Sequence, residues 1–304
     1  MSLRPVKRVV DAKPTLEGAG VKLHRAFGFG QTRDFDPFLL FDDFRNDNPQ
    51  DFLAGFPWHP HRGIETITYV LAGSVDHGDS LGNRGKLGAG DVQWMTAGSG
   101  IMHQEMPKGD QKGRMHGFQL WSNLPSSLKM TRPRYQDIKA ADVPEVIDDD
   151  GTVVRVVVGN FWGKTGPVEG VAADPNYIDV WVPPGKRKSL PVETTRHAFA
   201  YVFEGSGTFR DASHPFGVLT EKSDANGDEL LVRETVGNRS MVLFDSGDEV
   251  TVQAGDEGIR FLLVSGKPLK EPVAWYGPIV MNTQAELQQA MSDLQTGNFI
   301  KESA

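Results

Sequence analysis

Two short clusters of residues with metal-binding side chains stand out in this sequence: His59-Pro60-His61 and His103-Gln104-Glu105. In a β-strand, positions i and i+2 share one face, so two such strands facing each other would direct three imidazoles and one carboxylate to a single point. The chain has only eight His, which makes this clustering informative. The set suits a divalent first-row metal such as iron, nickel, manganese or copper. An octahedral ion with four protein ligands keeps positions open for a substrate or for oxygen.

The composition limits the classes of protein that this chain can belong to. A chain of 304 residues can bury a sizeable core and is expected to form two domains. The net charge of −8 disfavours nucleic acid as a partner, and the absence of Cys excludes disulfides, thiolate ligands and a cysteine nucleophile. The first residues lack the apolar core of a signal peptide, and no apolar run is long enough to span a membrane. We expect a soluble, cytoplasmic protein.

The elements that would position the two clusters are expected to be strands. The 34 Gly and 19 Pro of the chain favour many turns and short strands. Strand-like runs, each bounded by turn residues, fall at residues 66–71, 91–95, 117–121, 153–158, 177–182 and 260–264.

One helix is predicted near the C-terminus. Thr283 and Glu286 have the spacing of a capping box, and Gly297 can end the helix. Leu287, Met291 and Leu294 form an apolar stripe that must pack on a sheet, so the helix is interpreted as a structural brace.

A weak internal repeat predicts two similar β domains. Residues 69–73 match 201–205, and the motifs at 90–98 match those at 247–255, with a longer insertion expected at 206–240 in the second copy. In this alignment the four candidate ligands fall on residues that cannot rebuild the site: Pro191, Glu193, Arg260 and Leu262. Any metal is therefore expected in the N-terminal half alone.

Around the two clusters the sequence resembles a known family. Residues 55–65 with Gly73 resemble the first cupin motif, and Gly90, Gly98 and His103 resemble the second. More specifically, FPWHPHRGIETITYVLAGSVDHGDS and GDVQWMTAGSGIMHQEMP resemble the pirin family. DPFLLFDDF at 36–44 and GFQLWSNLP at 117–125 strengthen the resemblance, which is dense over residues 20–135 and thins in the C-terminal half.

The resemblance implies an all-β bicupin fold, in which two β-barrels pack together and a short α-helix follows. We expect an N-terminal metal-binding cupin domain at residues 1–137 and a C-terminal cupin domain without metal ligands at 138–304. The resemblance implies one divalent metal, described as iron in pirins, held by His59, His61, His103 and Glu105. Nickel, manganese, copper, cobalt and zinc are compatible with the same ligands.

The residues leave a second carboxylate open. A generic cupin would use Glu65, and residues 59, 61 and 65 could share a strand face, although Arg62-Gly63 can introduce a bulge that breaks the register. The pirin pattern places the carboxylate at Glu105.

The other candidates have structural interpretations. His77 is expected in a hairpin turn near the rim and His116 as a structural residue, whereas His24, His197 and His214 have no partner cluster. Trp58, Trp94 and Met95 could line a pocket, although such side chains are common in barrel cores.

The resemblance also implies a function. Pirin-like proteins are associated with quercetin 2,3-dioxygenase activity, in which O₂ opens the ring of a flavonol and carbon monoxide is released. Glu105 is then expected to accept the proton of the substrate's 3-hydroxyl as a catalytic base. The alternative is a non-enzymatic regulator, in which the metal's redox state controls binding of a protein partner. The acidic charge disfavours direct DNA binding by such a regulator.

Overall fold

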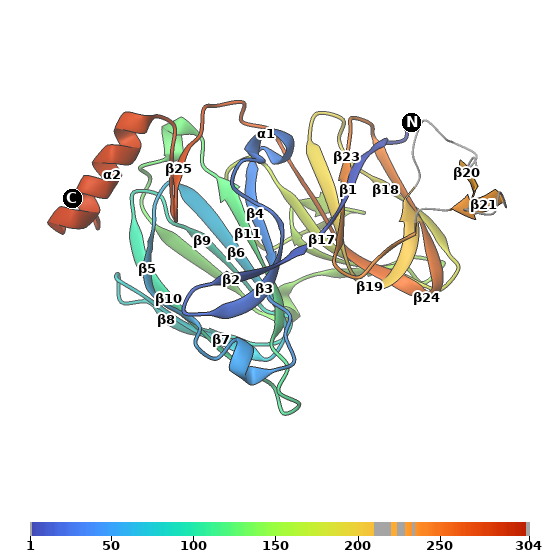
Figure 1. The fold of residues 1–304 in the computed structure, drawn as a ribbon, viewed down its shortest axis with the longest axis horizontal. Coiled ribbons are helices and arrows are strands. Elements are labelled where there is room, and N and C mark those ends of the chain that lie inside the picture. Colours follow the sequence, from blue (N-terminus) through green and yellow to red (C-terminus); the bar gives the residue numbers. More distant parts are fainter. Residues whose placement is uncertain (1, 210–219, 224–228, 233–234, 302–304) are drawn as a thin grey trace. The chain divides into compact units, whose positions relative to one another are not determined.

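The computed structural model describes residues 2–209, 220–223, 229–232 and 235–301. Its regular structure is almost entirely β, as Figure 1 shows. Two compact units are present. The ligand-bearing unit comprises Ala12–Val143, Gly166–Pro175 and Lys267–Ala304, and the second unit comprises Met1–Asp11, Pro144–Thr165 and Asn176–Gly266. The predicted all-β architecture with one C-terminal helix is confirmed.

The ligand-bearing unit contains two large sheets. A seven-stranded sheet has the order β12-β9-β6-β11-β4-β3-β2, and a four-stranded sheet has the order β5-β10-β7-β8. In Figure 1 the two sheets face each other around a common interior. Their strands are β2 (Lys13–Glu17), β3 (Val21–Phe27), β4 (Phe38–Asp43), β5 (Phe56–His61), β6 (Ile64–Ala72), β7 (Ser74–Asp79), β8 (Arg84–Leu87), β9 (Val92–Thr96), β10 (Ile101–Lys108), β11 (His116–Asn123) and β12 (Arg134–Ile138).

Strand β6 shows how local sequence produces this sheet. It is rich in β-branched and aromatic residues, lies inside the sheet between β9 and β11, and is almost wholly buried. Gly73 ends it with φ of 79°, where an added Cβ would lie 2.6 Å from the carbonyl oxygen of Lys108. A glycine is therefore required at this turn. The strand predicted at residues 66–71 is confirmed.

The second unit is built around a nine-stranded sheet. Its main path is β1-β23-β19-β24-β17-β14-β13, with β18 paired to β24 and β22 paired to β19. The strands of this unit are β1 (Val6–Asp11), β13 (Glu145–Ile147), β14 (Val153–Val158), β15 (Asn160–Phe161), β16 (Lys164–Thr165), β17 (Asn176–Val182), β18 (Arg187–Pro191), β19 (His197–Phe209), β20 (Thr220–Ser223), β21 (Glu229–Val232), β22 (Val236–Gly237), β23 (Ser240–Phe244) and β24 (Glu249–Gly266).

The sequence repeat corresponds to a repeat of structure. Residues 201–205 lie on β19, which sits between β23 and β24 just as β6 sits between β9 and β11. Gly205 repeats the positive φ of Gly73, at 65°. Apolar side chains including Val202, Phe261 and Leu263 form a buried core in this unit. Within the expected insertion, residues 210–219, among them His214, and residues 224–228 and 233–234 lie outside the described residues.

The C-terminal helix forms as predicted. Helix α2 (Gln284–Thr296) begins at Thr283, which makes a reciprocal capping box with Glu286, and ends at Gly297 in the left-handed conformation. Leu287 packs with Phe299 and with Ile279 of β26 (Ile279–Met281), which pairs with β25 (Ala274–Tyr276). A short helix, α1 (Thr32–Phe35), and 3₁₀ turns at Pro49–Asp51, Ser126–Leu128 and Ala140–Asp142 complete the described elements.

The helix belongs to the ligand-bearing unit, although it follows the other unit in the chain. The division predicted between residues 137 and 138 stays a prediction, because proximity in space is not a test of which segments fold independently.

Candidate metal centre

The two ligand clusters lie on neighbouring strands of the four-stranded sheet. Strand β5 pairs with β10 in antiparallel register, with His59 opposite His103 and His61 opposite Ile101. The two strands are therefore hydrogen-bonded neighbours in one sheet. We had expected instead that they would face each other. β5 is an edge strand, which explains why it tolerates Pro57 and Pro60.

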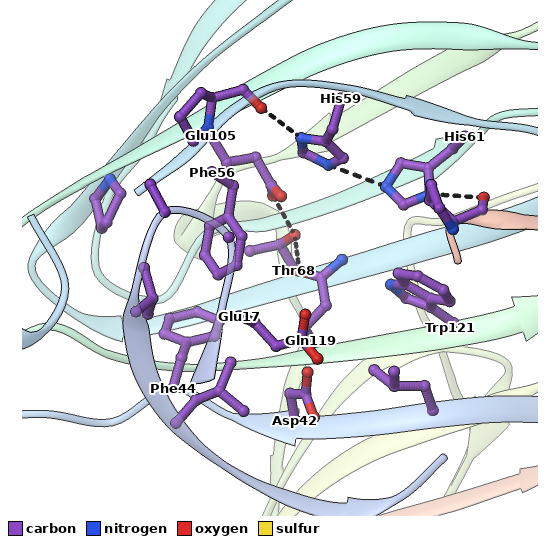
Figure 2. Close-up of a pocket in the computed structure, with 18 of the residues that line it drawn as sticks. Glu17, Asp42, Phe44, Phe56, His59, His61, Thr68, Glu105, Gln119 and Trp121 are labelled. Atoms are coloured by element: carbon purple, nitrogen blue, oxygen red, sulfur yellow. Dashed lines mark hydrogen bonds between the residues drawn. The ribbon is translucent and has the colours of Figure 1, made fainter. Parts of the chain in front are cut away.

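The three imidazoles converge on one point. The candidate ligand atoms of His59, His61 and His103 all lie within 4.8 Å of one another. The Nε2 atoms of His59 and His61 are 3.1 Å apart, as Figure 2 shows, and the ring centroid of His103 is 4.3 Å from that of His59. The period-two prediction for these three residues is borne out by this geometry, and the group could hold a metal ion.

Two backbone carbonyls orient the first two rings. Nδ1 of His59 lies 2.8 Å from the Pro57 carbonyl oxygen, and Nδ1 of His61 lies 3.3 Å from that of Pro278. A carbonyl oxygen can only accept, so each Nδ1 carries the proton and donates. Each Nε2 is then left with a lone pair, the form that binds a metal.

Burial keeps two of the rings neutral. The pKa of His61 lies well below its ordinary value because of burial and, to a lesser degree, the nearby His59. Burial, followed by His61 and His59, likewise lowers the pKa of His103. Neutral imidazole is the state required of a ligand, so near neutral pH these two rings need lose no proton before metal binds.

His103 provides a direct test of whether a metal fits. Both of its ring nitrogens are buried, and neither has a hydrogen-bond partner among the described residues. Burying an unsatisfied polar atom is costly unless another group satisfies it. An ion at the point where the three rings converge would satisfy one of these two nitrogens of His103, so the donor set fits a divalent metal.

The two candidate carboxylates have different surroundings. Glu105 is buried on β10, lines the same cavity as His59 and His61, and has Oε1 3.2 Å from Thr68 Oγ1. Burial raises the pKa of Glu105. Glu65 accepts from Thr96 Oγ1 at 2.7 Å and from the Ala172 amide at 3.3 Å, so both of its oxygens are engaged. Glu105 as the fourth ligand stays a prediction, which its position favours over Glu65.

Two other His residues have local partners. His77 is buried on β7 opposite Glu105, with Nε2 3.2 Å from Asp137, so our prediction of a turn residue is wrong. The turn begins after Asp79, where β7 ends. His116 pairs with Asp47 at 2.6 Å near the surface, which agrees with a structural role.

A cavity of about 610 Å³ opens beside the imidazoles. Trp58, Trp121 and Trp275 line it with exposed Phe29, whereas Trp94 and Met95 are fully buried. Of Trp58, Trp94 and Met95, which the sequence offered as pocket residues, Trp58 alone therefore lines the cavity. The dimensions and aromatic walls are typical of a site for a small organic molecule.

The cavity wall also contains a charged pair that was not predicted from the sequence. Arg25 donates to both carboxylate oxygens of Asp42, at 2.8 and 2.7 Å, and its Nη1 lies 2.8 Å from Glu17. Burial raises the pKa of Asp42 to about 6, against the opposing effect of Arg25. The signal was Asp42, which directly follows the apolar run FLLF at residues 38–41, because a charged residue in a buried strand needs a partner.

The fold and this site define a two-barrel cupin with a group of three His residues that could hold a metal ion. Residues 20–122 match the family model Pirin, and residues 177–300 match Pirin C-terminal cupin domain. The chain is 43% identical to a pirin-like protein of Caulobacter vibrioides, with 98% of this chain and 100% of that protein aligned. The chain belongs to the pirin family, and the bicupin fold predicted from the resemblance is confirmed.

Two solved structures extend the comparison. A crystal structure of quercetin 2,3-dioxygenase from Acinetobacter baumannii has a TM-score of 0.82 and 31% identity, covering 98% of this chain and 99% of that one. A bacterial pirin of Escherichia coli, in complex with nickel(II), has a TM-score of 0.62 and 19% identity, covering 86% and 99%. The second shows similarity of fold.

Across the described residues, no helix is long and apolar enough to cross a membrane.

Proposed function

We propose that this chain is a metal-dependent dioxygenase that opens the ring of a flavonol such as quercetin, with iron(II) held by His59, His61, His103 and Glu105. The main support is the convergence of three imidazoles beside an aromatic-lined cavity. The similar Acinetobacter baumannii structure, which is a quercetin 2,3-dioxygenase, supports the reaction type. The nickel-bound Escherichia coli pirin supports a divalent ion in this fold. Manganese, copper, cobalt and zinc also suit these ligands.

A bound divalent ion would supply Lewis-acid and redox chemistry at the end of the cavity. The chain itself would hold and orient the substrate. Trp121, whose ring lies 5.0 Å from that of His61 in an edge-to-face contact, would pack against a flat substrate, and Trp58 and Trp275 would exclude water from its other parts. The two oriented imidazoles, His59 and His61, would keep their Nε2 atoms directed at the same point throughout turnover.

Glu105 would act as the base. The 3-hydroxyl of a flavonol must lose its proton, and a buried carboxylate with a raised pKa can accept it at Oε1 or Oε2. Once protonated at Oε1, Glu105 would donate to Thr68 Oγ1, 3.2 Å away, whose own single proton is directed at Gln119 Oε1, 2.8 Å away. General-base catalysis of this kind contributes about 10²–10⁴-fold to the rate.

The test is anaerobic loading with iron(II) followed by oxygen uptake with quercetin. We expect uptake by the native chain and by His116→Ala, whose imidazole lies outside the group, but loss of uptake in His59→Ala. Glu105→Gln should retain the fold and lose turnover. Unchanged turnover in metal-loaded Glu105→Gln would contradict the role of the base. Tight iron binding without uptake in the native chain would contradict the dioxygenase and favour a regulator acting through a protein partner.

A further inference from the structure

A row of polar side chains crosses the seven-stranded sheet and faces the cavity. Gln119 of β11 lies directly opposite Thr68 of β6 on one side and Asp42 of β4 on the other, and Asp42 lies opposite Arg25 of β3. Residues directly opposite each other in a sheet project from the same face. All four line the cavity, and Figure 2 shows Thr68, Gln119 and Asp42 following one another away from Glu105.

Hydrogen bonds connect this row at both ends but not in the middle. Thr68 Oγ1 lies 2.8 Å from Gln119 Oε1, and Arg25 holds Asp42 through two bonds. Over the described part of the chain, no hydrogen bond joins Gln119 to Asp42. The oxygen of the Gln119 amide is engaged by Thr68, so its Nε2 is left as a donor. Each oxygen of Asp42 has a further lone pair beyond the bond from Arg25.

A donor and an acceptor side by side select the chemistry of their ligand. A hydroxyl group can accept from Gln119 Nε2 and donate to Asp42 at the same time. A carboxylate or phosphate cannot donate, and it would also meet the charges of Asp42, Glu17 and Glu105, which Arg25 alone opposes within the cavity wall. The space between Gln119 and Asp42 therefore suits a neutral hydroxylated ligand and disfavours an anion.

The space between Gln119 and Asp42 lies beyond Thr68, which is itself beside Glu105. Neighbouring strands are about 4.8 Å apart, so Asp42, two strands from Thr68, is about 10 Å away from it. A flavonol whose 3-hydroxyl lies near Glu105 would extend its pendant ring over Gln119 towards Asp42.

We propose that Gln119 and Asp42 form a binding site for a hydroxyl group on the pendant ring of the ligand, and that this site sets the preference for hydroxylated over unsubstituted flavonols. The assignment rests on the proposed function, from which it takes the ligand class. Arg25 acts as a positioning residue, because it fixes the orientation of the Asp42 carboxylate through both oxygens.

The test compares two ligands, quercetin and 3,5,7-trihydroxyflavone, which lacks hydroxyls on the pendant ring. Binding to the iron(II)-loaded protein is measured without oxygen, by quenching of the fluorescence of the tryptophans that line the cavity. A hydrogen bond to a charged group corresponds to about ten-fold in affinity or more, so native protein should bind quercetin at least about ten-fold more tightly.

Gln119→Met removes the amide while keeping the length of the side chain, and should reduce this preference to about three-fold or less. Asp42→Asn tests the acceptor and should reduce it in the same way. Met115→Leu, a volume-conserving change in the apolar wall, is the matched control and should keep the ratio, whatever it does to both affinities. If Asp42→Asn fails to fold because Arg25 loses its partner, Gln119→Met alone decides.

Equal binding of the two flavonols by the native protein, or an unchanged ratio in Gln119→Met, would overturn the proposal. If oxygen uptake persists with both flavonols in that case, the dioxygenase stands and only the hydroxyl site is lost. No binding of either ligand together with no oxygen uptake would overturn both.

Discussion

The carboxyl group of Glu65 should make the stability of this protein depend on pH in a defined direction. The residue is 1% exposed, accepts from Thr96 and Ala172, and has its pKa raised by burial from 4.5 to about 6. Between pH 4.5 and 6 the folded state therefore binds this proton more tightly than the unfolded state. Stability from this group is fully present below pH 4.5 and is lost as the pH rises through 6.

The size of the effect follows from the shift. A difference of 1.5 between the ordinary pKa of 4.5 and the folded value of about 6 corresponds to about 2 kcal/mol. Glu65→Gln does not titrate, and it loses about one hydrogen bond at every pH because its amide has a single acceptor oxygen. The native chain should therefore lose about 2 kcal/mol of stability relative to the variant between pH 4 and pH 7.

The assay is urea unfolding of metal-free native and Glu65→Gln protein, followed by tryptophan fluorescence, at half-unit steps of pH. Taking the difference between the two proteins removes the titration of all other groups. Asp110→Asn is the control: Arg114 lowers the pKa of Asp110 from 3.8 to about 2, so the difference for this variant should stay constant above about pH 5. A native-minus-Gln difference that is flat, or that rises with pH, would refute the reasoning.

Three further predictions concern the segments around the imidazoles. Asp293→Ala leaves the 2%-exposed guanidinium of Arg62 without its charged partner at 2.8 Å, which should lower the free energy of unfolding in urea by about 3–5 kcal/mol. Replacing Asp293 by Leu and Arg62 by Met together should restore most of this stability. A double variant that recovers none of it would contradict the account. Gly63→Ala should be more destabilising than Gly297→Ala in thermal unfolding. The two φ angles are alike, at 77° and 78°, but a Cβ at Gly63 would lie 1.9 Å from the Val280 carbonyl oxygen, whereas nothing lies within 4 Å of one at Gly297. Equal losses of stability would count against this clash. The lowered pKa values of His61 and His103 predict that protonation of these two rings does not weaken nickel(II) binding, measured by calorimetry, just below pH 6.5. A hundredfold loss of affinity per pH unit starting at 6.5, a factor of ten for each ring, would show that both rings protonate normally.

Much of the local structure was predictable because it depends on short-range rules. The strand at 66–71 and the helix capped by Thr283 formed where β-branched runs and the capping-box spacing indicated. The convergence of His59, His61 and His103 was also predictable, because i and i+2 share a strand face whatever the partner strand is.

The position of the turn after β7 was harder to predict from the sequence. His77 was expected in a hairpin turn because Asp and Gly surround it, yet it is a strand residue opposite Glu105. The pairing of β7 with β10 extends the strand through those turn-forming residues, so tertiary contacts override their local preference.

By itself, the sequence determined which side chains share a strand face, where the helix begins and ends, and which half of the chain holds the imidazoles. Tertiary structure alone decided that the carbonyl of Pro278 orients His61, although the two residues are far apart in the chain. It also decided that Arg25, Asp42, Gln119 and Thr68 form one row, because four strands had to pair in a particular register. Local patterns set the direction of a side chain relative to its own backbone, but which backbones become neighbours depends on long-range pairing that no short segment encodes.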